Sequence, residues 1–259
     1  MTFVIRIFGK KIYSFFYHIG CFGDMLWQTI KALKDVGTYA SLIGGQMMRI
    51  GIQSIPIVIY IACFAGMVTA IQSSENFDQF APPYLIGFVV EKGVLRELSA
   101  VLTSLVLAGR VGASIAAEIG TMRVTEQIDA LETLAFNPIS YLVVPRVIAG
   151  TVMFPVLTIF AALIGVTGGW LTSLVVMDVS TFEFFKGARA YFDNKDVILP
   201  MVKSVLFGAS ITLIACYQGF NSQGGAEGVG NSATKAAVVS CLMVLFLDFL
   251  IAALILFKY

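Results

Sequence analysis

Four charged residues interrupt stretches of sequence that are otherwise apolar, and their types suit ion pairing or the binding of a charged ligand. They are Arg96, Glu97, Lys203 and Asp248. A charged side chain is costly inside a lipid bilayer, so it usually marks a transport pathway or has a partner of opposite charge. At helical rise, Lys203 and Asp248 lie about six and about nine residues from the same membrane face. A lysine is long enough to bridge that difference, so we expect these two to pair.

Two roles are open for these four charges, which all fall in the outer half of the expected bilayer. They could hold a lipid headgroup, and this role is favoured for Arg96 and Glu97. Alternatively, they form buried ion pairs that fix the packing of helices and never touch a substrate.

Other arrangements of reactive residues are absent from the sequence. The single histidine, His18, has no companions with metal-ligand spacing, and there is no Ser-His-Asp set. The segment GFNSQGGAEGVGNSATK lacks the GxxxxGK[ST] pattern of a nucleotide-binding loop, so a flexible cytoplasmic connection is expected. The four cysteines never form CxxC, which favours buried, inert thiols; they are Cys21, Cys63, Cys216 and Cys241. The chain is therefore predicted to be non-catalytic, with no metal or cofactor of its own.

A short acidic segment, TEQIDALETLAFN at residues 125–137, has the pattern of an amphipathic helix. One face is apolar and another is acidic, the acidic residues being Glu126, Asp129 and Glu132. Thr125 is expected to cap the N-terminus, and Asn137 with Pro138 should end the helix. The prediction is a helix at about residues 125–136, too short to span a bilayer. It could dock on a partner, or it could rest on its own bundle.

The elements that must position these residues are predicted to be membrane-spanning helices. The chain has 259 residues, of which 58% are apolar and 13% charged, so lipid must be a large part of its solvent. The formal net charge of +1 gives no reason to expect nucleic acid. Five segments are apolar for about 20 residues, the length needed to cross the hydrocarbon core; they are 52–72, 94–117, 147–176, 197–217 and 236–257.

Before the first span, residues 3–36 alternate apolar and basic residues at helical spacing. This pattern is typical of a helix lying in the membrane interface, although a poor transmembrane helix is the alternative. We therefore divide the chain into an N-terminal interfacial region, 1–51, and a five-span domain, 52–259. Residues 1–51 hold six basic and two acidic residues, which places the N-terminus in the cytoplasm and the C-terminus outside.

The run LRELSAVLTSLVLAGRVGASIAAEIGTMRVTEQIDALETLAFNPISYLVVPRVIAG, residues 95–150, resembles the signature region of the MlaE (YrbE) family. These proteins are permease subunits of bacterial ABC transporters that act on lipids together with MCE-domain proteins. The resemblance implies an all-α protein of the bacterial inner membrane, with five transmembrane helices, an N-terminal interfacial helix and a cytoplasmic coupling helix. It also implies a homodimer with a lipid-holding cavity between the protomers, which charged residues of the spans line or brace.

By the same resemblance, the acidic segment is the coupling helix that contacts a separate cytoplasmic ATPase. The residues of this chain that match the family's ATPase-contacting residues are Glu126, Gln127, Asp129, Ala130, Leu131 and Glu132. The ATPase would bind ATP and magnesium. An MCE-domain protein on the periplasmic side would exchange lipid with the permease, and the family makes a phospholipid the leading expectation for that lipid.

The chain departs from the family pattern where Ser99 and Ala100 replace a usual Gly-Pro, and where Asn137 replaces an aspartate. Losing a proline removes an expected kink from the second span. An ion-coupled transporter of lipids or hydrophobic solutes, using Glu97 and Asp248 as proton sites, is the alternative function.

Overall fold

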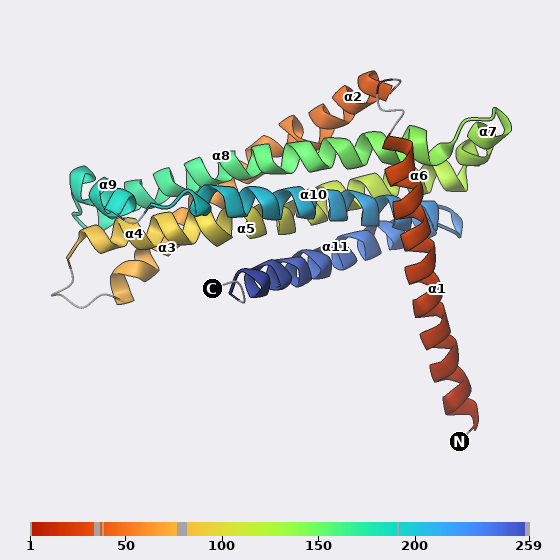
Figure 1. Cartoon of the computed structure of the whole chain (residues 1–259), viewed down its shortest axis with the longest axis horizontal. Coiled ribbons are helices and arrows are strands. Elements are labelled where there is room, and N and C mark those ends of the chain that lie inside the picture. The colour runs from red at the N-terminus through yellow and green to blue at the C-terminus, as the bar shows by residue number, and fades with distance from the viewer. Residues whose placement is uncertain (1, 34–36, 38, 77–81, 191, 257–259) are drawn as a thin grey trace.

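The computed structural model describes residues 2–33, 37, 39–76, 82–190 and 192–256, and within these ranges the chain is helical and has no strand. The long helices run side by side along one axis, as Figure 1 shows. The helices are α1 (Thr2–Ala32), α2 (Ala40–Ile50), α3 (Ile55–Asn76), α4 (Tyr84–Gly93), α5 (Ser99–Leu107), α6 (Ala113–Val124), α7 (Gln127–Thr133), α8 (Val144–Val176), α9 (Thr181–Ala190), α10 (Lys195–Phe220) and α11 (Gly225–Leu256).

Five helical stretches of the described chain are long and apolar enough to cross a membrane, which confirms the predicted number of spans. They are Ala40–Glu75, Tyr84–Val124, Ile139–Val176, Lys195–Phe220 and Gly225–Leu254. Four of the five begin several residues before the predicted segment, because hydropathy marks the apolar part of a helix and not its polar ends. The chain is thus an all-α, multi-pass membrane protein.

The last span gives the clearest correction of a boundary. The glycine-rich segment 219–235 was expected to be a flexible connection, but α11 already begins at Gly225. Only a short turn separates it from α10, and this turn ends at Gly224 and Gly225, which have φ angles of 90° and 69°. Glycine adopts such left-handed conformations without a steric penalty, so two of the glycines make a tight turn between spans.

The second span is one helical rod with two wide turns. Residues Val94–Leu98 (η3) and Ala108–Gly112 (η4) are π-helical and separate α4, α5 and α6. Such turns are rare and occur frequently at functional sites. They carry Arg96, Glu97 and Arg110, so three charges of this span lie in its irregular parts.

Close contacts between glycines hold α3 against α8. A Cβ atom added to Gly66 would lie 1.8 Å from the carbonyl oxygen of Gly165, and one added to Gly169 would lie 3.1 Å from that of Gly66. Small residues let two backbones approach, which is how helices gain packing energy in lipid. The GxxxG motif of Gly165 and Gly169 therefore packs within the chain.

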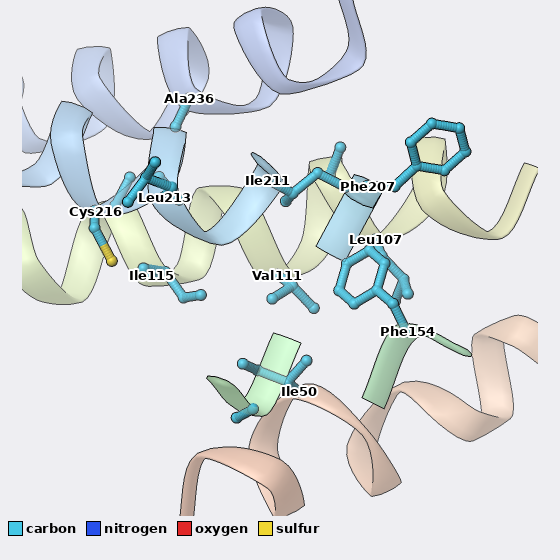
Figure 2. Close-up of a cluster of buried hydrophobic side chains, with 14 of the residues drawn as sticks. Ile50, Leu107, Val111, Ile115, Phe154, Phe207, Ile211, Leu213, Cys216 and Ala236 are labelled. Carbon is cyan, nitrogen blue, oxygen red and sulfur yellow. The ribbon is translucent and has the colours of Figure 1, made fainter. Parts of the chain in front are cut away.

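The core lies between the second span, α8 and α10, as Figure 2 shows. Phe154 and Phe207 are fully buried beside Leu107, and the fully buried Ile211 lies between Phe207 and Cys216. This packing fixes α10 against the second span, and thereby sets which charged residues of the two helices can meet.

Helix α1 crosses the end of the bundle at which α6 and α7 lie, at a steep angle to the long helices (Figure 1). His18 Nδ1 lies 2.7 Å from the Tyr217 hydroxyl, and the ring of Phe22 packs edge-on against Tyr217. This orientation is the one expected of a helix in the plane of the membrane interface. Residues 34–36, at the end of the predicted amphipathic segment, lie outside the described residues.

Candidate functional site

A buried ion-pair cluster centres on Lys203 of α10. Its ammonium nitrogen lies 2.7 Å from Glu97 Oε2 and 2.8 Å from Asp248 Oδ1. The expected pair of Lys203 and Asp248 is therefore present, and Glu97 joins it. The side chain of Lys203 is 2% exposed, whereas those of Glu97 and Asp248 are 50% and 23% exposed. One buried cation thus holds together the second span, α10 and α11.

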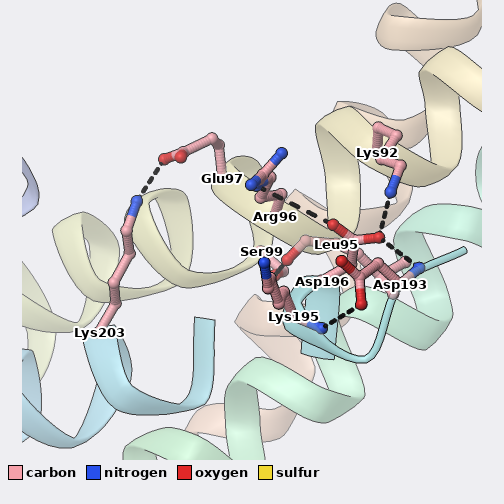
Figure 3. A network of polar contacts seen from close by, with 9 residues as sticks. All are labelled: Lys92, Leu95, Arg96, Glu97, Ser99, Asp193, Lys195, Asp196 and Lys203. Carbon is pink, nitrogen blue, oxygen red and sulfur yellow. Dashed lines mark hydrogen bonds and ion pairs between the residues drawn. The ribbon is translucent and has the colours of Figure 1, made fainter. Parts of the chain in front are cut away.

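Arg96 points to a different group from its neighbour Glu97, as Figure 3 shows. Its Nε atom lies 4.0 Å from Asp196 Oδ1 at the beginning of α10. Asp196 is buried and also accepts hydrogen bonds from Lys92 and from the backbone N–H of Asp193, the latter at 2.9 Å. Arg96 and Lys203 therefore belong to two adjoining networks on the same end of the bundle.

Sequence reasoning missed Lys92 and Asp196 as members of this cluster. The sequence predicts loops for both, because the hydropathy of the segments 73–93 and 177–196 falls below that of a span. The helices in fact begin at Tyr84 and Lys195, so both residues lie inside helical spans. Their charges were the only available signal, since opposite charges in facing span ends are candidates for pairing.

Within the ion pairs of the two networks the charges balance, although the buried carboxylate of Glu91, next to Lys92, has no hydrogen-bond partner in the described part of the chain. Three basic residues, Lys92, Arg96 and Lys203, contact three acidic ones, which are Glu97, Asp196 and Asp248. Balance of this kind is needed where charges leave water. Of the four residues predicted to form a lipid path, Arg96 and Glu97 are about half exposed. These two are therefore the most exposed of the four, and Lys203 contacts Glu97 from the buried side.

The second span is irregular at η3, the π turn that carries Arg96 and Glu97. The Ser99 hydroxyl donates a hydrogen bond of 3.0 Å to the Leu95 carbonyl, one helical turn back. Serine bonding of this type bends helices slightly. The second span is thus irregular next to Ser99 and Ala100 although the proline of the family pattern is missing.

The short helix α7 lies at the opposite end of the bundle, and its start differs from the prediction. It spans Gln127–Thr133, not 125–136. Thr125 does not cap it, because the Thr125 hydroxyl donates to the Thr121 carbonyl at 2.8 Å and thus extends the hydrogen bonding of α6. The residue before the helix is Glu126, in a left-handed conformation with φ of 59°. A sharp bend, not a side-chain cap, separates α6 from α7.

The end of α7 is also earlier than predicted. The Phe136 N–H donates to the Leu131 carbonyl at 3.0 Å, and Ala135 is left-handed with φ of 58°. This is the Schellman pattern, in which glycine is the usual residue at the left-handed position. Asn137 does not end α7 but caps the following helix, because its Oδ1 atom accepts a 2.9 Å hydrogen bond from the Ile139 N–H.

The faces of α7 divide the predicted coupling residues into two groups. Ile128 is fully buried in the core, and Leu131 packs partly against it, so part of the apolar face rests on the chain's own bundle. The other coupling residues are exposed, with Asp129 2.5 Å from Arg123; they are Glu126, Gln127, Asp129, Ala130 and Glu132. Two further apolar side chains next to the helix, Leu134 and Phe136, are exposed and were missed.

A third ion-pair network braces the α7 end of the bundle. Glu118 Oε1 of α6 lies 2.9 Å from Arg49 of α2 and 3.1 Å from Arg146 of α8. Arg146 is buried and also donates to the Leu142 carbonyl at 2.7 Å. In the described part of the chain, no three His, Cys, Asp or Glu side chains group as metal ligands would.

Comparison with known proteins places this geometry in a family. The family model described as "Permease MlaE" matches residues 43–254. A probable ABC transporter permease of Rickettsia prowazekii is 41% identical over 97% of both chains, and one of Synechocystis is 42% identical over 80% of this chain and 79% of its own. The intermembrane phospholipid transport system permease protein of Haemophilus influenzae is 32% identical over 96% of both chains.

Proposed function

Because this chain belongs to the MlaE family of ABC transporter permeases, we propose that it moves phospholipid between the bacterial inner membrane and a periplasmic MCE-domain partner. The observation that carries the proposal is the pair of half-exposed charges, Arg96 and Glu97, in a π turn of the second span. A guanidinium suits a lipid phosphate, and a carboxylate suits an amine.

The lipid cavity in this proposal lies between two copies of the chain. Helix α11 supports this, because its most apolar stretch is 11% buried, against 28–50% for the other four spans. Its exposed side chains are large and apolar; they include Leu242, Leu245, Phe246 and Phe249. A face of this kind fits either lipid or a second protomer. It lies next to the Lys203 cluster, because Asp248 of the same helix pairs with Lys203.

The driving force in this proposal is ATP, bound with magnesium by a separate cytoplasmic ATPase that docks on α7. The exposed acids of α7 and the exposed Leu134 and Phe136 give the ATPase a surface of mixed character. The orientation that follows has α1 and α7 in the cytoplasm, and α9 and the C-terminus on the periplasmic side.

A mechanical route joins α7 to the charge cluster in this scheme. Ile128 is packed into the core and Asp129 pairs with Arg123 at the end of α6, so a push on α7 acts on the second span. That span continues through η4 and α5 to Arg96 and Glu97. The π turns are the points where such a helix can change its winding. For ATP or lipid to shift the permease between two conformations, it must bind one conformation more tightly than the other.

Transport in reconstituted vesicles tests the proposal. The permease and its ATPase are placed in vesicles with a fluorescent phospholipid, and transfer to a soluble MCE-domain acceptor is followed. We expect transfer to require ATP and to be lost when Glu97→Gln and Arg96→Gln are combined. Transfer driven by a proton gradient without the ATPase would support the ion-coupled alternative and contradict ours. The pairing of both candidate proton sites with Lys203 argues against that alternative.

A further inference from the structure

A polar cavity of about 240 Å³ lies between α2 and the second span, at the α7 end of the bundle and away from the Lys203 cluster. Helix α2 leans away from the bundle axis here, as Figure 1 shows. The walls combine charged, amide and apolar side chains. The polar residues that line it are Gln46, Arg49, Gln53, Arg110, Ser114 and Glu118.

Arg110 is the unusual residue of this cavity. It lies in the π turn η4, within a stretch predicted to cross the hydrocarbon core, and it is partly buried. Its guanidinium donates to the Ser54 hydroxyl, and no carboxylate of the described residues forms an ion pair with it. A guanidinium has five N–H donors. A single neutral acceptor therefore leaves most of these donors unpaired and does not neutralise the positive charge.

The carboxylate of Glu118 cannot balance this charge. One of its oxygens already serves both Arg49 and Arg146, at 2.9 and 3.1 Å. The cavity lining holds two arginines and one glutamate, and that glutamate also pairs with the buried Arg146 behind the wall, so positive charge is in excess here. Uncompensated charge at membrane depth is costly, and Arg110 is the partly buried arginine of this lining that has no acidic partner among the described residues.

We propose that this cavity binds the phosphate of a phospholipid from the inner leaflet, with Arg110 and Arg49 as its ligands. Arginine matches the geometry of phosphate with paired hydrogen bonds, and the amides of Gln46 and Gln53 add neutral donors. The apolar walls formed by Ile50, Val111 and Ile115 suit the first part of an acyl chain. The inference deepens the proposed function, on which it rests for the cargo and for the cytoplasmic placing of this end. It adds a lipid site in each protomer, separate from the charges near α9.

Photocrosslinking of lipid in nanodiscs tests the site without ATP or partner proteins. A benzophenone amino acid replaces Ser114, which is exposed and lines the cavity. The nanodiscs contain a neutral matrix with equal small amounts of phosphatidylglycerol and diacylglycerol, which share acyl chains and differ in the phosphate. We expect a several-fold excess of crosslinked phosphatidylglycerol.

Substitutions then assign the excess to the arginines. Arg110→Gln should lower the phosphatidylglycerol yield about tenfold, as expected for loss of a charge-assisted bond, while Arg110→Lys should lower it less. The matched control is Arg189→Gln, an exposed arginine on α9, which should change nothing. Equal yields for the two lipids, or an unchanged yield in a folded Arg110→Gln variant, would overturn the proposal.

Inorganic phosphate separates a lipid from a free anion. We expect millimolar phosphate to leave the crosslinking unchanged, because the apolar walls contribute to lipid binding alone. Complete competition would show that the cavity is a site for free phosphate, and would overturn the assignment to lipid. Because no transport step is measured, failure of this test leaves the proposed transport function intact, and the vesicle assay can fail while this site is occupied.

Discussion

The ammonium of Lys203 on α10 lies 2.7 Å from Glu97 Oε2 on the second span. The same nitrogen also lies 2.8 Å from Asp248 of α11. A single buried lysine therefore ties three spans together next to Arg96 and Glu97, the two half-exposed charges of this end of the bundle. Any change in the winding of the second span at η3 must move Glu97 relative to this fixed cation.

Replacing Lys203 tests its positioning role. Lys203→Met leaves Asp248 unpaired in a largely buried position and Glu97 unpaired in a half-exposed one. We expect the free energy of unfolding to fall by about 2 kcal/mol, less than for a fully buried pair because Glu97 is partly solvated. Denaturant unfolding in detergent measures this, with the exposed Lys235→Met as the control.

A triple variant separates stability from transport in the same cluster. Lys203→Met with Glu97→Gln and Asp248→Asn removes all three charges, so no unpaired ion is left among these three residues. We expect stability to recover toward the wild-type value while lipid transfer stays lost. Recovery of both would show that the charges brace helices only, and would assign no lipid role to Glu97.

The exposed apolar residues beside α7 should contribute to ATPase docking. Leu134→Ser and Phe136→Ser change side chains that are 68% and 51% exposed, so we expect stability within about 0.5 kcal/mol of wild type. Co-purification of the ATPase should fall strongly. By contrast, Ile128→Ser should lower stability by about 2–4 kcal/mol, because it empties a buried site and adds a hydroxyl.

If the Leu134 and Phe136 variants bind the ATPase normally while Asp129→Ala does not, the docking surface is the acidic face alone. If none of these variants loses the ATPase, α7 is a structural element of its own bundle.

Glycine packing between α3 and α8 should tolerate no side chain. A Cβ on Gly66 would meet the backbone of Gly165 at 1.8 Å, which no side-chain movement can relieve. We expect Gly66→Ala to prevent accumulation of folded protein, as measured by size-exclusion chromatography in detergent. Gly230→Ala on α11 is the matched control, since nothing lies within 4 Å of its added Cβ, and alanine should stabilise the helix by up to about 1 kcal/mol.

The hydrogen bond between His18 and Tyr217 should hold α1 on the bundle. Tyr217→Phe removes the hydroxyl that lies 2.7 Å from His18 Nδ1 but keeps the ring contact with Phe22. We expect a loss of about 1 kcal/mol in the docking of α1, seen as faster hydrogen exchange in the second half of α1. Unchanged exchange would mean that Phe22 and the buried Met25 hold the helix by themselves.

The sequence by itself determined the class, the five spans and the family resemblance, because hydrophobic length and a long unusual motif need no knowledge of packing. It also allowed the pair of Lys203 and Asp248 to be inferred, since both depths follow from helical rise. The position of α7 along the chain was evident from its amphipathic period, although its two ends were not, because left-handed residues at Glu126 and Ala135 have no glycine to mark them.

Only the tertiary structure decided which groups meet. Glu97 pairs with Lys203 while Arg96 pairs with Asp196. Both partners lie on α10, about two helical turns apart, so the two neighbours point in opposite directions along the same helix. Ile128 is buried and Phe136 is exposed because the bend before α7 sets which face meets α6. Only the structure shows that Arg110 has no acidic partner among the described residues, because Glu118 pairs with Arg49 of α2 and Arg146 of α8 instead. Hydropathy measures transfer into lipid along one helix, whereas pairing depends on the rotation and register of helices packed against each other.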